Sequence, residues 1–156
     1  MTGSTRMLSD DVYRSRLAVT IAALRYWVPS VSDAAETEET ETSDFWRLAV
    51  APRIAQGCPF ELILHSDQRH DLIIAGEVYE DRLIGTLDLF LPLAEAIAAG
   101  TVLQRQWISA VTGRPLSIET LVTLPSGAVW RDGVGPASAN GIPLVSRDRH
   151  FLPYRR

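Results

Sequence analysis

The segment 60–79 is apolar on both sides of an extended chain, and this feature most constrains the fold. It contains two runs, FELILH and HDLIIAGEVY, which are typical of β-strands and are separated by a short polar stretch. A two-residue turn between them would place His65 opposite His70 and Leu62 opposite Ile73. A strand pair that is apolar on both faces is normally covered on both faces. We therefore expect helices over one face and a second sheet or a partner subunit over the other.

Three helices are predicted from apolar residues that recur at helical spacing. The first spans 10–28, between a serine that can act as N-cap and a proline. The second spans 43–57 and places Trp46 and Val50 on one side, although a proline inside it requires a kink. The third spans 89–99 and ends at a glycine.

The remaining extended segments predict hairpins. The segment that ends at Tyr79 is expected to turn at Glu80-Asp81, which would bring Gly76 opposite Gly85. Three further extended segments, joined by turn sequences that each contain a glycine, follow the third helix and predict an antiparallel meander. The fold class is therefore α+β, with a mostly antiparallel sheet built from hairpins, two N-terminal helices and one helix between the strand groups.

We predict one domain over residues 1–156, since this length suits a single core. Residues 1–8 are expected to be disordered, and residues 132–156, rich in glycine and proline at first, are expected to form an irregular C-terminal arm. Residues 30–43 are predicted to be an acidic linker, because the stretch 33–44 holds six acids and no base.

Composition excludes several chemistries. The chain has 15 arginines and no lysine, so lysine Schiff bases and phosphate-binding loops that need a lysine are excluded. We interpret the bias as the coding preference of a GC-rich bacterial genome. Its single cysteine, Cys58, cannot form a disulfide within the chain, and no apolar run approaches the roughly 18 residues of a membrane span. We therefore expect a cytoplasmic protein.

A histidine-rich hairpin tip is the first candidate site. With a turn at Asp67-Gln68, His65 and His70 would face each other, and with Asp67 and a more distant His150 they could hold a divalent metal such as zinc. This set predicts, as one alternative, a small metal-dependent hydrolase. The other interpretation is a polar hairpin tip with two unligated histidines, since aspartate is common in turns. No other cofactor is expected.

An aromatic and basic face is the second candidate site. If Val111 paired with Leu116, Arg105 would lie opposite a valine and between Trp107 and Trp130. These three residues could bind a flat or anionic ligand, or a protein partner, by stacking and cation–π attraction. The simpler interpretation is an arginine that covers two core tryptophans and reaches water.

The last ten residues hold four arginines, Arg147, Arg149, Arg155 and Arg156, interleaved with aromatic residues. Such a tail could bind nucleic acid, which is the second alternative function, but the net charge of −4 opposes binding to a polyanion. We favour an arm that docks on a neighbouring subunit, for which the acidic stretch 33–44 is an electrostatic complement.

The missing catalytic signatures favour a function other than catalysis. We expect a non-catalytic binding or interaction module, homo-oligomeric and bacterial, whose partner is a second copy of the chain or another protein. A small molecule is a further option, whereas nucleic acid and a membrane are not favoured.

Overall fold

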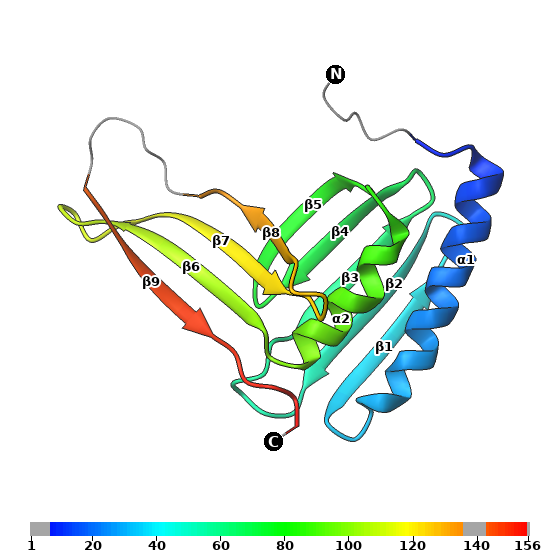
Figure 1. Cartoon of the computed structure of the whole chain (residues 1–156), viewed down its shortest axis with the longest axis horizontal. Coiled ribbons are helices and arrows are strands. Elements are labelled where there is room, and N and C mark those ends of the chain that lie inside the picture. Colours follow the sequence, from blue (N-terminus) through cyan, green and yellow to red (C-terminus); the bar gives the residue numbers. More distant parts are fainter. Residues whose placement is uncertain (1–6, 136–142, 156) are drawn as a thin grey trace.

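The computed structural model describes residues 7–135 and 143–155 as an α+β fold with two antiparallel sheets and two α-helices (Figure 1). The predicted fold class is thereby confirmed, but there is one N-terminal helix where two were predicted. The elements are, in chain order, α1 (Asp10–Trp27), the 3-10 helix η1 (Val28–Ser30), β1 (Ala35–Glu41), β2 (Phe45–Pro52), β3 (Phe60–His65), β4 (Arg69–Ile74), β5 (Glu77–Leu83), the 3-10 helix η2 (Leu87–Leu89), α2 (Phe90–Ala98), β6 (Val102–Ser109), β7 (Pro115–Thr123), β8 (Val129–Gly133) and β9 (Leu144–His150).

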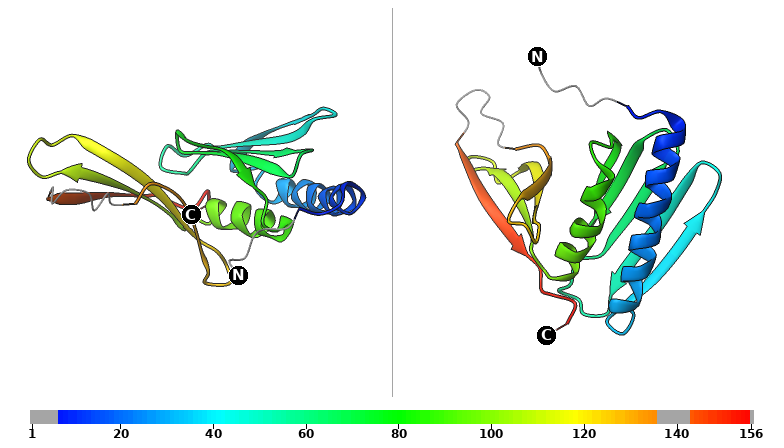
Figure 2. Two further views of the ribbon diagram at one scale, coloured as in Figure 1. Left: turned by 90° about the horizontal axis from the view of Figure 1, so that it is seen from above. Right: turned by 45° about the vertical axis from the view of Figure 1, so that its right-hand side comes forward.

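The strands form two sheets. The first has the order β1-β2-β3-β4-β5, which is a simple meander, and the second has the order β8-β7-β6-β9. Both α-helices lie on one side of the five-stranded sheet, and the four-stranded sheet lies beside β5 and extends away from it (Figures 1 and 2). The opposite face of the five-stranded sheet carries no helix or strand from the described ranges 7–135 and 143–155, so the expectation that a second sheet of the chain covers it is wrong.

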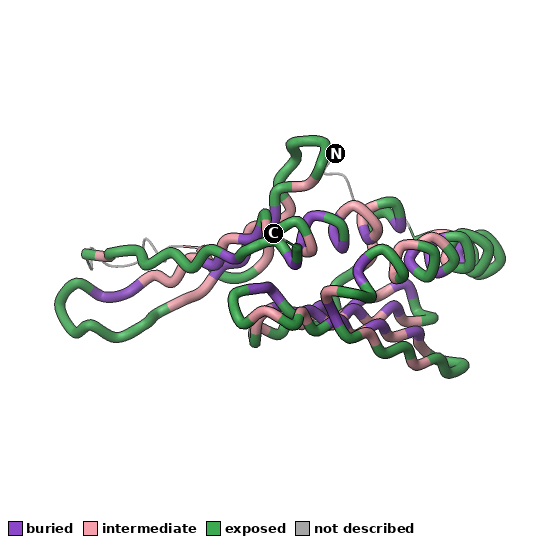
Figure 3. The backbone as a smooth tube through the Cα atoms, turned by 90° about the horizontal axis from the view of Figure 1, so that it is seen from below, coloured by how far each residue is buried: buried purple, intermediate pink, exposed green. Residues whose placement is uncertain are grey.

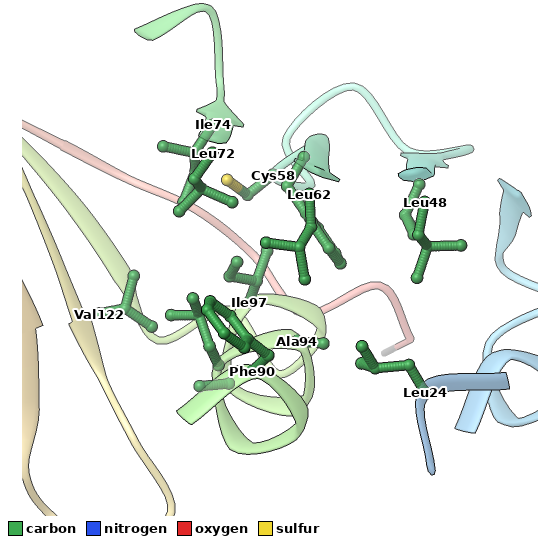
Figure 4. Packing of buried hydrophobic residues seen from close by; sticks show 14 of the residues in the cluster. Leu24, Leu48, Cys58, Leu62, Leu72, Ile74, Phe90, Ala94, Ile97 and Val122 are labelled. Carbon is green, nitrogen blue, oxygen red and sulfur yellow. The ribbon is translucent and has the colours of Figure 1, made fainter. Parts of the chain in front are cut away.

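The main core lies between the helices and the inner face of the five-stranded sheet. Figure 3 shows the buried positions gathered in this layer, and Figure 4 shows Leu48, Leu62 and Leu72 of the sheet facing Leu24 of α1 and Phe90 of α2. Each of these side chains is almost fully buried. Burial of one such side chain contributes roughly 1.5–3 kcal/mol, so this layer is the main source of stability.

The predicted second helix is wrong, because residues 45–52 form strand β2. Its residues alternate between buried Trp46, Leu48 and Val50 and more exposed neighbours, which is the period of a strand. Trp46 and Val50 are four residues apart, a spacing that both a helix and a strand can place on one face. Leu48, which lies midway between them, distinguishes the two patterns.

The predicted acidic linker is also wrong for most of its length, because η1 and strand β1 occupy it. Strand β1 pairs along its whole length with β2. Its inward-facing Glu39 and Glu41 both bind Arg25 of α1, and the Trp46 indole donates a hydrogen bond to Glu39 at 2.5 Å. These two glutamates can point to the inner face of the sheet because the Arg25 side chain of the helix that covers it forms ion pairs with both.

The β3–β4 hairpin has a different register from the predicted one. Its loop has three residues, 66–68, and Gln68 has a positive φ of 66°, as in three-residue hairpin loops. Consequently Leu64 and not His65 pairs with His70, and Leu62 pairs with Leu72. A shift of one residue reverses the face of every side chain in one strand relative to the other.

The next hairpin turns earlier than predicted. Ala75 and Gly76 both have positive φ, 49° and 90°, and form a two-residue turn between β4 and β5. The predicted turn at Glu80-Asp81 and the pairing of Gly76 with Gly85 are therefore wrong. The Ala-Gly sequence inside an apolar run was the local signal for this turn.

The helix predicted over 89–99 and the meander after it are confirmed as α2, β6, β7 and β8. The segment predicted as an irregular arm over 132–156 contains the end of β8 and strand β9, which pairs with β6. Its residues 136–142 and the expected disorder of residues 1–6 lie outside the described ranges.

After β9 the C-terminal segment docks on its own chain. Phe151 and Tyr154 are buried, and the Tyr154 hydroxyl donates a hydrogen bond to the carbonyl oxygen of Cys58 at 2.6 Å. Arg155 binds the Asp33 carboxylate, so the predicted complement between this tail and the acidic stretch occurs within one chain. Cys58 itself is fully buried, and burial raises the pKa of its thiol to about 12, which keeps it protonated.

The docking of this segment can be tested at Gly100, which ends α2 with a φ of +82°. A Cβ at this position would lie 2.5 Å from the Pro153 nitrogen, whereas at Gly113, φ +71°, it would meet nothing within 4 Å. We expect Gly113→Ala to cost about 1–2 kcal/mol through backbone strain alone, and Gly100→Ala to cost about 1–3 kcal/mol more. Urea unfolding of both variants measures the difference. Equal losses would show that the C-terminal segment does not pack against Gly100.

Candidate functional site

Arg105 and Trp107 share one face of β6, as their spacing of two residues requires. The Arg105 guanidinium lies 5.9 Å from the centre of the Trp107 ring and forms a bidentate ion pair with Asp148 of β9 at 2.9 and 3.0 Å. The Trp107 indole donates a hydrogen bond to Glu119 of β7 at 3.3 Å. The polar groups of Arg105 and Trp107 thus already bond to side chains on the neighbouring strands.

Trp130 lies on the opposite face of the same sheet. It pairs with Val122, as predicted, but Arg105 pairs with Glu119, because the β6–β7 register is shifted by three residues from the predicted one. An odd shift changes the face. Trp130 instead packs against the Tyr79 ring with the planes tilted by 72° and the centres 6.2 Å apart. The predicted bracket of Arg105 by two indoles is therefore wrong.

The four metal candidates are spread over several surfaces. His65 lies on the outer face of the five-stranded sheet and contacts the Asp71 carboxylate at 2.8 Å. His70 lies on the inner face, against the Phe90 ring at 5.0 Å. Asp67 is exposed in the hairpin loop, and His150 is exposed on β9 of the other sheet. Within the described residues, no three histidine, cysteine or acidic side chains are grouped in a way that could hold a metal ion.

A network of polar side chains joins the two sheets. The hydroxyls of Tyr79 in β5 and Thr120 in β7 share a hydrogen bond of 2.7 Å. The Gln104 amide of β6 donates to the Ile74 carbonyl oxygen of β4 at 3.0 Å. All three side chains are buried, so each hydrogen bond replaces one that water would otherwise make. Their directions fix the position of one sheet relative to the other.

An ion pair lies at the rim of this junction. Arg82 of β5 binds the Asp132 carboxylate of β8 at 2.9 and 3.2 Å. His70, the register partner of Arg82, is buried beside it, and its Nδ1 atom has no hydrogen-bond partner among the described residues. Burial lowers the pKa of His70, although the nearby carboxylates of Asp132 and Asp71 act in the opposite direction.

The outer face of the five-stranded sheet contains a hollow of about 480 Å³ between β1 and the β4–β5 turn. Its floor is apolar and its rim is acidic. The side chains that point to this face are Glu36, Glu38, Ala49, Ala51, Glu61 and Ile73. The sequence does not predict this hollow, because a strand pattern that is apolar on both sides does not indicate which face remains uncovered.

The charges of this outer hollow are unbalanced. Arg47 of β2 forms ion pairs with Glu61 and, at 3.5 Å, with Glu38. Glu36 is exposed and takes part in no ion pair of the described chain. The hollow thus combines half-buried apolar side chains with an excess of negative charge.

Comparisons with protein-family models, with curated proteins and with solved structures found no significant match for this chain. In the described part of the chain, neither helix has the length and apolar character that a membrane crossing requires.

The buried His70 predicts a pH-dependent stability. The unfolded chain takes up a proton near the ordinary histidine pKa of 6.5, whereas the folded chain takes it up only at lower pH. Protons therefore favour the unfolded state, and the free energy of unfolding should fall as the pH drops below 6.5.

We expect His70→Leu to remove this slope between neutral pH and about pH 5, because leucine has no proton to take up. It should also raise stability at pH 5, since it removes an unpartnered buried nitrogen. Urea unfolding at a series of pH values measures both effects. The control His150→Gln, at an exposed position, should keep the slope, and a His70→Leu variant with an unchanged slope would contradict the assignment.

Proposed function

We propose that this chain is a non-catalytic protein-interaction module that binds a segment with both basic and apolar side chains in the outer hollow. The observation that carries the proposal is the hollow itself, a half-apolar depression with an acidic rim on an otherwise uncovered sheet face. Aliphatic side chains of a partner would pack on Ala49, Ala51 and Ile73. Its cationic groups would pair with Glu36 and Glu38.

Charge complementarity favours a cationic partner over the other candidates. A second copy that presented the same face would place glutamate opposite glutamate, which costs stability. An anionic ligand such as nucleic acid would meet the same repulsion. The volume of the hollow, about 480 Å³, lies within the range of about 300–1,000 Å³ that ligand sites commonly span.

The other candidates have less support. The polar groups of Arg105 and Trp107 are already hydrogen-bonded to Asp148 and Glu119. Binding of a ligand at this position would have to break those contacts. The hydrolase alternative depended on His65 and His70 facing each other, and they occupy opposite faces of the sheet. We further propose a bacterial, cytoplasmic protein, on the strength of its lysine-free composition and single cysteine.

The proposal predicts selective binding of a cationic peptide. The probe is an extended peptide of alternating arginine and valine, and its control is the same peptide with glutamate in place of arginine. NMR titration of the whole protein should shift the amide signals of Ala49, Glu61 and Ile73 with the first peptide only. Equal shifts with both peptides, or shifts confined to other surfaces, would refute the assignment of this hollow.

A double variant tests the acidic rim. Glu36→Gln with Glu38→Gln should weaken binding of the arginine peptide by about tenfold, since each exposed charge pair is worth up to about 1 kcal/mol. Glu95→Gln, at an exposed position on α2, should leave the affinity unchanged. If Glu95→Gln weakened binding as much as the double variant, the attraction would depend on net charge and not on this site.

A further inference from the structure

The outer side of α1 carries apolar residues at a regular spacing. Val12, Val19 and Tyr26 are seven residues apart, and Ser15 and Ala22 lie between them at the same interval. In an α-helix this spacing places all five on one stripe, which we call the α1 stripe. The residues that α1 buries against the sheet, such as Tyr13 and Leu24, belong to the opposite side.

The α1 stripe is exposed within the chain. Tyr26 is 90% exposed, Val19 71% and Val12 41%, and Figure 3 shows the outer side of this helix as mainly exposed. A single exposed valine needs no explanation. Large apolar residues repeated every seven positions are unusual on a solvent face, where an amphipathic helix is expected to be polar. The repeat is the spacing with which two helices pack against each other.

We infer that the α1 stripe is a homodimer interface in which α1 of one copy packs antiparallel against α1 of a second copy. This surface lies on the helix side of the five-stranded sheet (Figure 2), whereas the residues that line the outer hollow point to the other side. The dimer is therefore independent of the proposed function, and it would leave both hollows free.

The ends of α1 complement each other in an antiparallel pair. The first turn carries Asp10 and Asp11, and the last turn carries Arg25. An antiparallel pair centred near residue 18 places Asp11 of each copy beside Arg25 of the other. Arg25 holds Glu39 and Glu41 on its inner side, yet its side chain remains 47% exposed and can reach a further carboxylate. The opposed helix dipoles also favour this direction.

Shape favours a second copy in the same way. The small residues Ser15 and Ala22 leave room between the three large ones, so side chains of an identical stripe can interdigitate. A twofold axis makes this surface its own partner. The helix has 18 residues and is about 27 Å long. One helix pair of this length buries less than a standard interface, so we expect a dissociation constant in the micromolar range or weaker.

Sedimentation velocity at increasing concentration of the whole protein tests the dimer. We expect a monomer–dimer equilibrium, and Val19→Glu should raise the dissociation constant at least about 100-fold, because it brings two carboxylates close to the twofold axis. The control is Val111→Glu, the same substitution at a valine that is 76% exposed in the β6–β7 turn. It should leave the equilibrium unchanged.

A chain that stays monomeric at the highest accessible concentration would overturn the inference, as would a dimer that Val19→Glu does not weaken. Circular dichroism of Val19→Glu should show an unchanged fold, since the position is exposed. If Val19→Glu lost helix, the same sedimentation experiment would be done with Ala22→Glu, which lies on the same stripe and is also exposed.

Disulfide trapping tests the direction of the helices. Under mild oxidation, Val12→Cys combined with Ala22→Cys should form a covalent dimer, because an antiparallel pair brings these positions within one turn of each other. Val12→Cys alone should not, since the two copies of residue 12 lie far apart. A covalent dimer of the single variant would instead show a parallel pair. The native Cys58 is fully buried and does not compete.

Discussion

The structure depends on one-sided burial of the five-stranded sheet. Its inner face is covered by α1 and α2, and the side chains that point to this face are mainly apolar, while Glu39 is held there by Arg25. Side chains alternate along each strand, so packing of one set of residues on the inner face directs the residues between them to the outer face. The outer face then receives Ala49, Ala51, Glu61 and Ile73, and these residues form the hollow. The candidate site is thus a consequence of how the core was built.

The second sheet is attached both by apolar packing and by directional contacts. Val122 reaches the main core, but Tyr79, Thr120 and Gln104 join the sheets through hydrogen bonds, and the Arg82–Asp132 pair closes the rim. Buried polar networks specify one arrangement, since any other would leave their groups without partners. The unpartnered Nδ1 of His70 lies at the edge of this junction. Stability there should consequently respond to protons more than elsewhere in the core.

The two proposed surfaces differ in kind. The outer hollow is acidic and concave, and we propose that it binds a partner of opposite charge, whereas the α1 stripe consists of uncharged residues and is proposed to pair with a second copy. They lie on opposite sides of the five-stranded sheet, and one can be occupied without the other. A dimer joined through α1 would display two hollows directed away from each other, an arrangement suited to binding two partner segments at once.

The sequence by itself determined the fold class, helices α1 and α2, the later meander and the pairing of Trp130 with Val122. Each rests on local rules: helical periodicity bounded by a serine, a proline or a glycine, and short turns between β-rich runs. It also determined the two-sided apolar character of 60–79 that leaves an apolar floor on the outer face.

Tertiary structure decided strands β1 and β2, because Trp46 and Val50 fit both periods and the glutamates of β1 need Arg25 from a distant helix. It also decided the registers, since one extra loop residue moved His65 and His70 to opposite faces, and a three-residue shift separated Arg105 from Trp130. The physical reason is that the face of a side chain in a strand depends on whether the register shift is odd or even, and only packing over the whole sheet selects that shift.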